Sequence, residues 1–158
     1  MGVPNIALCR IDNRLVHGQV GITWLAHSKA NLILVADDDV AQDEQQQTIM
    51  RLTAEFYGAQ IRFFTLQHTA QIIGQAAPSQ RIFLITRTPG AMLELVKLGV
   101  PIQEVNVGNM HFSPGKRQIS SRAYADEQEL LQLKELQSLI RRLYFQDVPN
   151  STVENIVL

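Results

Sequence analysis

A histidine and two other charged side chains lie within six residues of one another near the start of the chain. The stretch RIDNRLVHGQV places Asp12, Arg14 and His17 directly after an apolar run and directly before Gly18. A simple turn requires none of these three side chains, whereas a site for a charged group can use all of them. The residue types at this spacing therefore indicate chemistry as well as a connection.

The group that this stretch suits best is a phosphoryl group. Imidazole side chains in general titrate near about pH 6.5, so a neutral ring with a nitrogen lone pair is available at pH 7. Arg14 offers a planar fork of donors to the oxygens of a phosphoryl group in transfer, and Asp12 can orient the ring or hold Arg14. His17, Arg14 and Asp12 are therefore the catalytic candidates, and Asn13 and Gly18 are phosphate-binding candidates.

The same side chains also have an ordinary explanation. A loop histidine is commonly solvent-facing or hydrogen-bonded without a function, and Asp12 and Arg14 could form a structural ion pair. Spacing alone leaves the two interpretations evenly balanced. Neither GxxxxGK[ST] nor GxGxxG follows the first apolar run, which disfavours nucleotide hydrolysis and dinucleotide binding.

Short apolar runs alternate along the chain with longer segments of helical pattern. Near-continuous apolar runs are typical of strands covered on both faces, and the alternation predicts right-handed βαβ units. We therefore expect one α/β domain over residues 1–158, with an open, mainly parallel twisted sheet and helices on both faces. The predicted strands span residues 5–11, 31–36, 60–65, 81–86 and 103–108.

Helices are expected between these strands and after the last of them. Pro89 suits a first helical turn, Gly58 and Gly99 suit helix ends, and Asp126 can cap a helix over 125–139. The segment after residue 139 could continue that helix or form a strand, and its Tyr and Phe with the following Pro favour a strand. One helical stripe is marked by Ile49, Met50, Leu52, Thr53 and Phe56.

This architecture gives the loop from Asp12 to Gly18 a favoured position. In open parallel sheets, ligands gather at the carboxyl ends of the strands, near the point where strand order reverses, and the first strand is often central. The segment after Gly18 is predicted to be helical, so the loop lies at a helix N-terminus, where free N–H groups favour an anion.

Two other loops hold further phosphate-binding candidates. Arg87 follows the predicted strand 81–86 and could reach the phosphate, or pair with a nearby carboxylate. The stretch NVGNMHFSPGK follows the predicted strand 103–108 and contains His111, Ser113 and Lys116, together with Asn109. Because polar residues are common in loops, an ordinary structural role is the alternative for each of them.

The sequence gives little support for a metal-binding or cofactor-binding site. The acids Asp37, Asp38 and Asp39 follow the second predicted strand and could bind a cation or accept phosphate, but helix capping explains them more simply. No histidine pair has the spacing of a zinc site, and the lone Cys9 lies in an apolar strand pattern. We expect neither a metal nor a cofactor.

Composition narrows the class of protein. The chain has 158 residues with a net charge of −1, which disfavours a nucleic-acid partner because phosphate binding requires a basic surface. No secretion signal is recognisable, and no apolar run approaches the roughly 20 residues of a membrane span. We expect a cytoplasmic protein that would serve a membrane process only by peripheral docking.

The stretch RIDNRLVHGQV also resembles a known family. It is similar to the sequence around the phosphorylated histidine in the IIB components of the mannose/fructose/sorbose family of the phosphoenolpyruvate-dependent sugar phosphotransferase system. The stretch NVGNMHFSPGKRQIS resembles the family's later glycine-containing segment, and the likeness extends to the ending around FQDVPNS. It leans towards the N-acetylgalactosamine and galactosamine branch.

The resemblance implies a phosphocarrier. Such proteins accept a phosphoryl group from a phosphohistidine on a IIA partner and pass it to a sugar taken up through membrane IIC and IID partners. The acceptor maps onto His17, where the family uses Nδ1, and Arg14 and Asp12 match its supporting positions. Two alternatives stay open at this stage. One is a non-catalytic regulatory module that binds a phosphorylated metabolite reversibly, and the other is an aspartyl-phosphate receiver built on residues 37–39.

Overall fold

The structure is a computed structural model that describes residues 3–156 and 158. A six-stranded, fully parallel sheet with strand order β3-β2-β4-β1-β5-β8 forms its centre. The predicted class, an open parallel sheet with helices on both faces, is confirmed. The strands are β1 (Asn5–Ile11), β2 (Leu32–Ala36), β3 (Gln60–Phe64), β4 (Arg81–Thr86), β5 (Glu104–Val107) and β8 (Arg142–Phe145).

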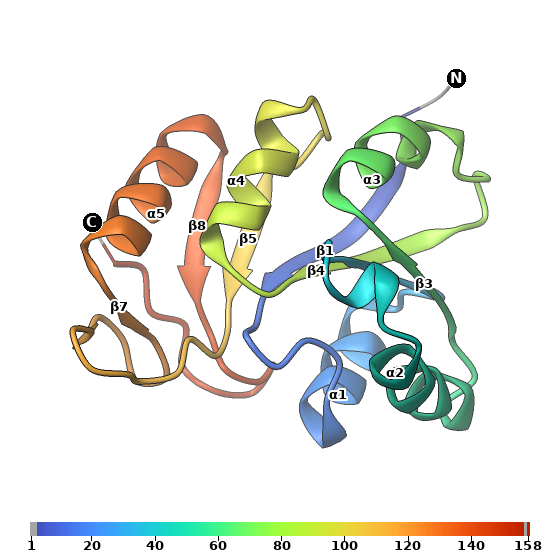
Figure 1. The fold of residues 1–158 in the computed structure, drawn as a ribbon, viewed down its shortest axis with the longest axis horizontal. Helices are drawn as coiled ribbons and strands as arrows, with labels where there is room; N and C mark the ends of the chain where they lie inside the picture. The colour runs from blue at the N-terminus through green and yellow to red at the C-terminus, as the bar shows by residue number, and fades with distance from the viewer. Residues whose placement is uncertain (1–2, 157) are drawn as a thin grey trace.

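Helices lie on both faces of the sheet (Figure 1), and the described residues contain five α-helices. The buried side chains form two separate cores. Helices α1 and α2 pack on one face, against the odd-numbered residues of β2, while α3, α4 and α5 pack on the other. The alternation of side chains along each strand therefore builds both cores from the same apolar run. The helices are α1 (Gly18–Ser28), α2 (Glu44–Phe56), α3 (Leu66–Ile72), α4 (Pro89–Lys97) and α5 (Glu127–Leu139).

Strand order reverses between the neighbouring strands β1 and β4. The chain leaves β1 through α1 on one face of the sheet, and it leaves β4 through α4 on the opposite face. In open parallel sheets, the region outside two adjacent carboxyl ends whose helices diverge in this way is the ligand-binding crevice. The loop that begins at Asp12 lies at this crevice, as the sequence predicted.

The predicted helix ends and the last strand are confirmed. Pro89 lies in the first turn of α4, while Gly58 and Gly99 follow the ends of α2 and α4 with φ of +74° and +97°. Asp126 caps α5 in a capping box with Glu129. Residues 142–145 form a strand, as their aromatic pattern indicated.

Only part of the apolar stripe predicted on α2 faces the core. Only Met50 of that set is buried, and it contacts the core together with Ala54 one turn later. Ile49, Leu52 and Phe56 are 66%, 63% and 81% exposed. The reason is the helical period: positions 50 and 54 share one face, whereas positions 49, 52 and 56 lie roughly 120–180° around the helix axis from that face.

Three short elements were not predicted. Two 3₁₀ turns, Val40–Gln42 and Ile73–Gln75, precede α2 and follow α3. A two-residue hairpin pairs β6 (Arg117–Gln118) with β7 (Tyr124–Ala125). Strands of two residues carry no detectable alternation, so sequence patterns give no signal for them.

Candidate functional site

His17 lies immediately before α1, in a loop whose first residue follows β1. Its backbone is extended, with φ of −143° and ψ of 134°, and it occupies the N-cap position of the helix. Its side chain forms no capping hydrogen bond, because the ring is turned towards Asp12. The first N–H groups of α1 therefore have no side-chain cap, which leaves a favourable position for an anion beside the ring.

Asp12 fixes the chemical identity of the two ring nitrogens. Nε2 of His17 lies 3.2 Å from Oδ2 of Asp12, and the imidazole is 13% exposed. Burial by itself raises the pKa of Asp12. The hydrogen bond from His17, the charge of Arg10 and the backbone amide of Arg14 outweigh it and hold that pKa below its ordinary value. An ionised carboxylate can only accept, so it selects the neutral tautomer that has its proton on Nε2 and its lone pair on Nδ1.

Arg10 is the functional candidate that sequence reasoning missed. Its guanidinium is 1% exposed and its Nη2 lies 3.1 Å from Oδ2 of Asp12. The same guanidinium donates from Nη1 to Oδ1 of Asn106 and to the carbonyl oxygen of Gln146. A charged residue inside the apolar run NIALCRI was the available signal, because a strand covered on both faces rarely buries an arginine without a partner.

The backbone of the loop is held at several points. The amide of Asp12 donates to the carbonyl of Thr86, and the amides of Arg14 and Leu15 donate to the side chain and backbone oxygens of Asp12. Leu15 and Gly18 have φ of +56° and +44°. Leu15 is buried, so core packing holds this unfavourable conformation, whereas Gly18 adopts its conformation without a Cβ penalty.

Arg14 and Asn13, which follow Asp12 in the loop, differ in exposure. The Arg14 side chain is exposed, and in the described part of the chain its guanidinium forms no hydrogen bond or ion pair. Asn13 is anchored through its backbone, because its amide donates to the carbonyl of Asn109 at 2.9 Å. Its side-chain Oδ1 is buried without a hydrogen-bond partner among the described residues.

Arg87 reaches the loop from the end of β4 and positions its backbone. Nη1 donates to the carbonyl oxygen of Asn13 at 3.0 Å, and Nε lies 3.2 Å from Oδ2 of Asp37. Nη2 donates to Gln46 of α2. Of the two roles considered for Arg87, the pairing with a carboxylate is the one that the structure contains, while contact with a phosphate stays a prediction.

The loop after β5 contributes one side chain beside Asp12. Nδ2 of Asn109 lies 3.4 Å from Oδ2 of Asp12. His111 is exposed and Ser113 is half-buried, with no hydrogen bond from either side chain to His17. Lys116 pairs with Glu129 of α5 at 3.1 Å. A role for His111, Ser113 or Lys116 at the phosphate therefore stays a prediction.

The acids after β2 serve the local structure. Asp37 accepts from the amide of Val40, and Asp38 accepts from the amide of Leu66 at the start of α3. The carboxylate of Asp43 caps α2. Within residues 3–156 and 158, no group of three His, Cys, Asp or Glu side chains is arranged to hold a metal ion.

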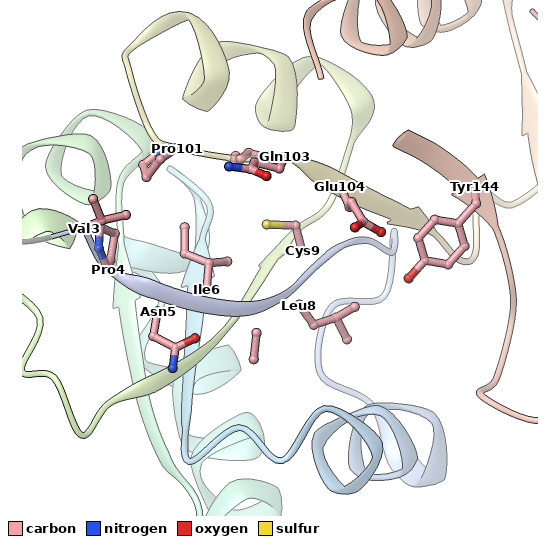
Figure 2. Close-up of a pocket in the computed structure, with 12 residues that line it drawn as sticks. Val3, Pro4, Asn5, Ile6, Leu8, Cys9, Pro101, Gln103, Glu104 and Tyr144 are labelled. Carbon is pink, nitrogen blue, oxygen red and sulfur yellow. The ribbon is translucent and has the colours of Figure 1, made fainter. Parts of the chain in front are cut away.

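A pocket of about 380 Å³ lies at the amino end of β1, and Figure 2 shows the side chains that line it. It is lined by the first residues of β1 and by Pro101, Glu104 and Tyr144. Buried Cys9 borders it, and burial raises the pKa of that thiol to about 12, so the thiol is un-ionised and unreactive at neutral pH. The length of β1, roughly 20 Å at about 3.3 Å per residue, separates this pocket from the His17 loop.

Near the start of α1, the exposed apolar surface comes from α2 and from Tyr57 after it. Trp24 of α1 does not contribute, because it is 2% exposed and its Nε1 donates to the carbonyl of Asp147. Val20 is only half-buried. The exposed apolar side chains near the start of α1 are Leu52, Phe56 and Tyr57, which line a shallow pocket with Gly18 and Gln19.

None of the helices described here is long and apolar enough to span a membrane.

Known proteins resemble this chain over almost its whole length. Residues 6–157 match the model of the family described as "PTS system sorbose subfamily IIB component". The chain is 54% identical over 156 residues to the N-acetylgalactosamine-specific phosphotransferase enzyme IIB component 1 of Escherichia coli K12, and the alignment covers 99% of each.

A solved structure and a relative that joins two components also resemble the chain. The crystal structure of that E. coli component superposes with a TM-score of 0.94, covering 97% of this chain and 100% of the other. The mannose-specific EIIAB component of E. coli K12 is 32% identical over 132 residues, and the alignment covers 83% of this chain and 41% of that protein.

Proposed function

The chain belongs to the sorbose-subfamily IIB components of the sugar phosphotransferase system, and on this premise we propose that His17 is its phosphoryl acceptor. As a IIB component, it is a phosphotransferase component of sugar uptake. The observation that supports His17 is the hydrogen bond from its Nε2 to Asp12, which leaves the lone pair of Nδ1 free at the crevice. Of the four histidines, only His17 makes such a contact with a carboxylate in the described part of the chain.

The proposed step is an in-line transfer between two imidazoles. The lone pair of Nδ1 attacks phosphorus, the N–P bond of the donor's phosphohistidine breaks, and its electron pair returns to the donor ring. The proton on Nε2 of His17 stays where Asp12 holds it. Arg14 and the first amides of α1 stabilise the phosphoryl oxygens, since positioning and electrostatics dominate this chemistry.

The donor in this proposal is a IIA protein, and the final acceptor is a sugar. The mannose-specific EIIAB component, as its name says, joins IIA and IIB in one protein, which supports a IIA partner. Membrane IIC and IID subunits would present the sugar, so the chain would work in the cytoplasm and dock on them. The likeness to the N-acetylgalactosamine-specific component of E. coli supports N-acetylgalactosamine or galactosamine as the sugar.

Intact-protein mass spectrometry tests the acceptor. The chain is incubated at neutral to basic pH with phosphoenolpyruvate, the general phosphotransferase proteins and a IIA protein. We expect one added phosphate, stable in base and labile in acid, which is absent in His17→Ala. His27→Ala is the matched control, because His27 is exposed and lies in the last turn of α1, at the other end of that helix from His17. No adduct on the wild type, with the donor active on a known acceptor, would favour reversible binding of a phosphorylated metabolite.

A further inference from the structure

We propose that Arg10 is a positioning residue for phosphoryl transfer. Its guanidinium lies in a buried notch at the carboxyl ends of β1, β5 and β8, and from there it holds the carboxylate of Asp12 against Nε2 of His17. The proposal rests on the proposed function of His17. It adds a residue that does not touch the phosphoryl group but determines which ring nitrogen is free to accept it.

Arg10 connects four parts of the fold. On its own strand it pairs with Asp12 two residues later, at 3.1 Å. Across the sheet it donates to Asn106 of β5, which is its direct neighbour in the parallel register. It also donates to the carbonyl of Gln146 after β8 at 3.0 Å, and its Cζ lies 5.2 Å from the centre of the Trp24 ring of α1.

Asn106 orients its amide for this contact. It is fully buried, and its Nδ2 donates to the carbonyl of Gln146 at 3.1 Å. Because the amide nitrogen is engaged there, Oδ1 faces the guanidinium of Arg10 and accepts from it. The arginine is thus held by two neutral acceptors and directs its remaining side towards Asp12.

Gly108 keeps the notch open. A Cβ at this position would lie 2.1 Å from Nη2 of Arg10, which is closer than a Cβ approaches any non-bonded atom in real structures. The residue cannot shift freely, because its amide donates to the carbonyl of Ile11 at 2.8 Å. Any side chain at position 108 would therefore displace the guanidinium from its partners.

The buried charge has a chemical purpose in the transfer. Removing Asp12 from water favours its neutral form, and the adjacent guanidinium restores the carboxylate. An ionised Asp12 that is already paired leaves the Nε2 proton on His17 after phosphorylation. The ring then departs as neutral imidazole when the phosphoryl group moves on, whereas a ring that had lost this proton would have to depart as an anion.

Two substitutions of Arg10 separate its charge from its volume. Arg10→Lys keeps a cation beside Asp12, while Arg10→Met fills similar space without charge. We expect Arg10→Met to slow phosphate acceptance on the order of 10²-fold, the effect of a misplaced reacting group, and Arg10→Lys to recover part of that loss. The ¹⁵N NMR shifts of His17 should show the Nε2–H tautomer in the wild type and a mixture of tautomers in Arg10→Met.

The matched control is Arg81→Met. Like Arg10, Arg81 donates to two neutral acceptors, here the backbone carbonyls of Ser28 and Lys29, but it lies at the amino end of β4. It should leave both the tautomer and the acceptance rate unchanged. If Arg10→Met and Arg10→Lys both accept phosphate as fast as the wild type and both keep its tautomer, Arg10 only fills space and the proposal is wrong.

Gly108→Ala keeps the test decisive if Arg10→Met does not fold. It retains every charge and moves only the guanidinium, so a folded variant should show the same mixed tautomer and slowed acceptance. A folded Gly108→Ala with wild-type tautomer and rate would overturn the proposal. A wild-type chain that accepts no phosphate would instead overturn the proposed function of His17, so the two failures are distinguishable.

Discussion

At the residue scale, the direction of one hydrogen bond separates His17 from an ordinary loop histidine. Sequence spacing placed Asp12 near the ring but left two roles open, orienting the imidazole or holding Arg14. The structure gives both oxygens a task, since Oδ2 faces His17 and Arg10 while Oδ1 accepts the amide of Arg14. The Arg14 guanidinium, by contrast, is not held by Asp12.

Asp12→Asn tests this arrangement. An amide at position 12 can direct its N–H group at Nε2, which would move the ring proton to Nδ1 and remove the nucleophile. We expect phosphate acceptance to fall roughly 10²-fold or more while the fold is retained. The measurement is the initial rate with phosphorylated IIA protein, and an unchanged rate would show that the ring does not depend on the carboxylate.

The depressed pKa of Asp12 also predicts an effect of pH on stability. A carboxyl group with a lower pKa in the folded state stabilises the fold above its unfolded pKa, about 3.9, and this contribution is lost as pH falls through the folded pKa. We expect the free energy of unfolding to decrease below about pH 4, and to decrease less steeply in Asp12→Asn. Urea unfolding of both proteins at pH 7 and pH 3 makes the comparison, and parallel pH dependence would contradict it.

At the element scale, the five strands predicted from apolar runs agree with the structure to within one or two residues. Buried parallel strands carry the strongest pattern because both of their faces are apolar. The faces of α2 could not be assigned in the same way, since its apolar residues outnumber the positions that touch the core. Arg10 was missed for a related reason: a run pattern records where a strand lies and not which side chain crosses to its neighbours.

The two faces of α2 predict opposite effects on stability. Met50→Ala should destabilise the protein by about 2–5 kcal/mol because it leaves a cavity in the core. Phe56→Ser, at a side chain that is 81% exposed, should change the unfolding free energy by less than about 0.5 kcal/mol. Thermal or urea unfolding of both variants checks this, and a large loss in Phe56→Ser would mean that this side chain packs in the folded protein.

At the scale of the whole molecule, the site depends on topology that local patterns reveal only in part. The crevice forms because β1 and β4 are neighbours whose helices leave on opposite faces, and β5 and β8 complete it on the far side. Sequence predicted that the loop after β1 lies at the sheet edge. It could not predict that residues 106, 108 and 146 meet residue 10, because those contacts depend on strand order.

The proposed sugar can be tested with the whole relay. In cells that lack the N-acetylgalactosamine-specific IIB component 1 of E. coli, expression of this chain should restore uptake of N-acetylgalactosamine, and His17→Ala should not. The expectation rests on the 54% identity between the two chains. Restored uptake of a different sugar, with none of N-acetylgalactosamine, would refute the proposed specificity and leave the acceptor unaffected.

The accepting atom can be identified by ¹⁵N NMR of the phosphorylated chain with labelled histidine. Coupling to phosphorus identifies the ring nitrogen that carries the phosphoryl group. We expect one phosphohistidine, at Nδ1 of His17, with the proton retained on Nε2. Phosphorus on Nε2, or on any residue other than His17, would contradict it, because the hydrogen bond to Asp12 would then not select the accepting atom.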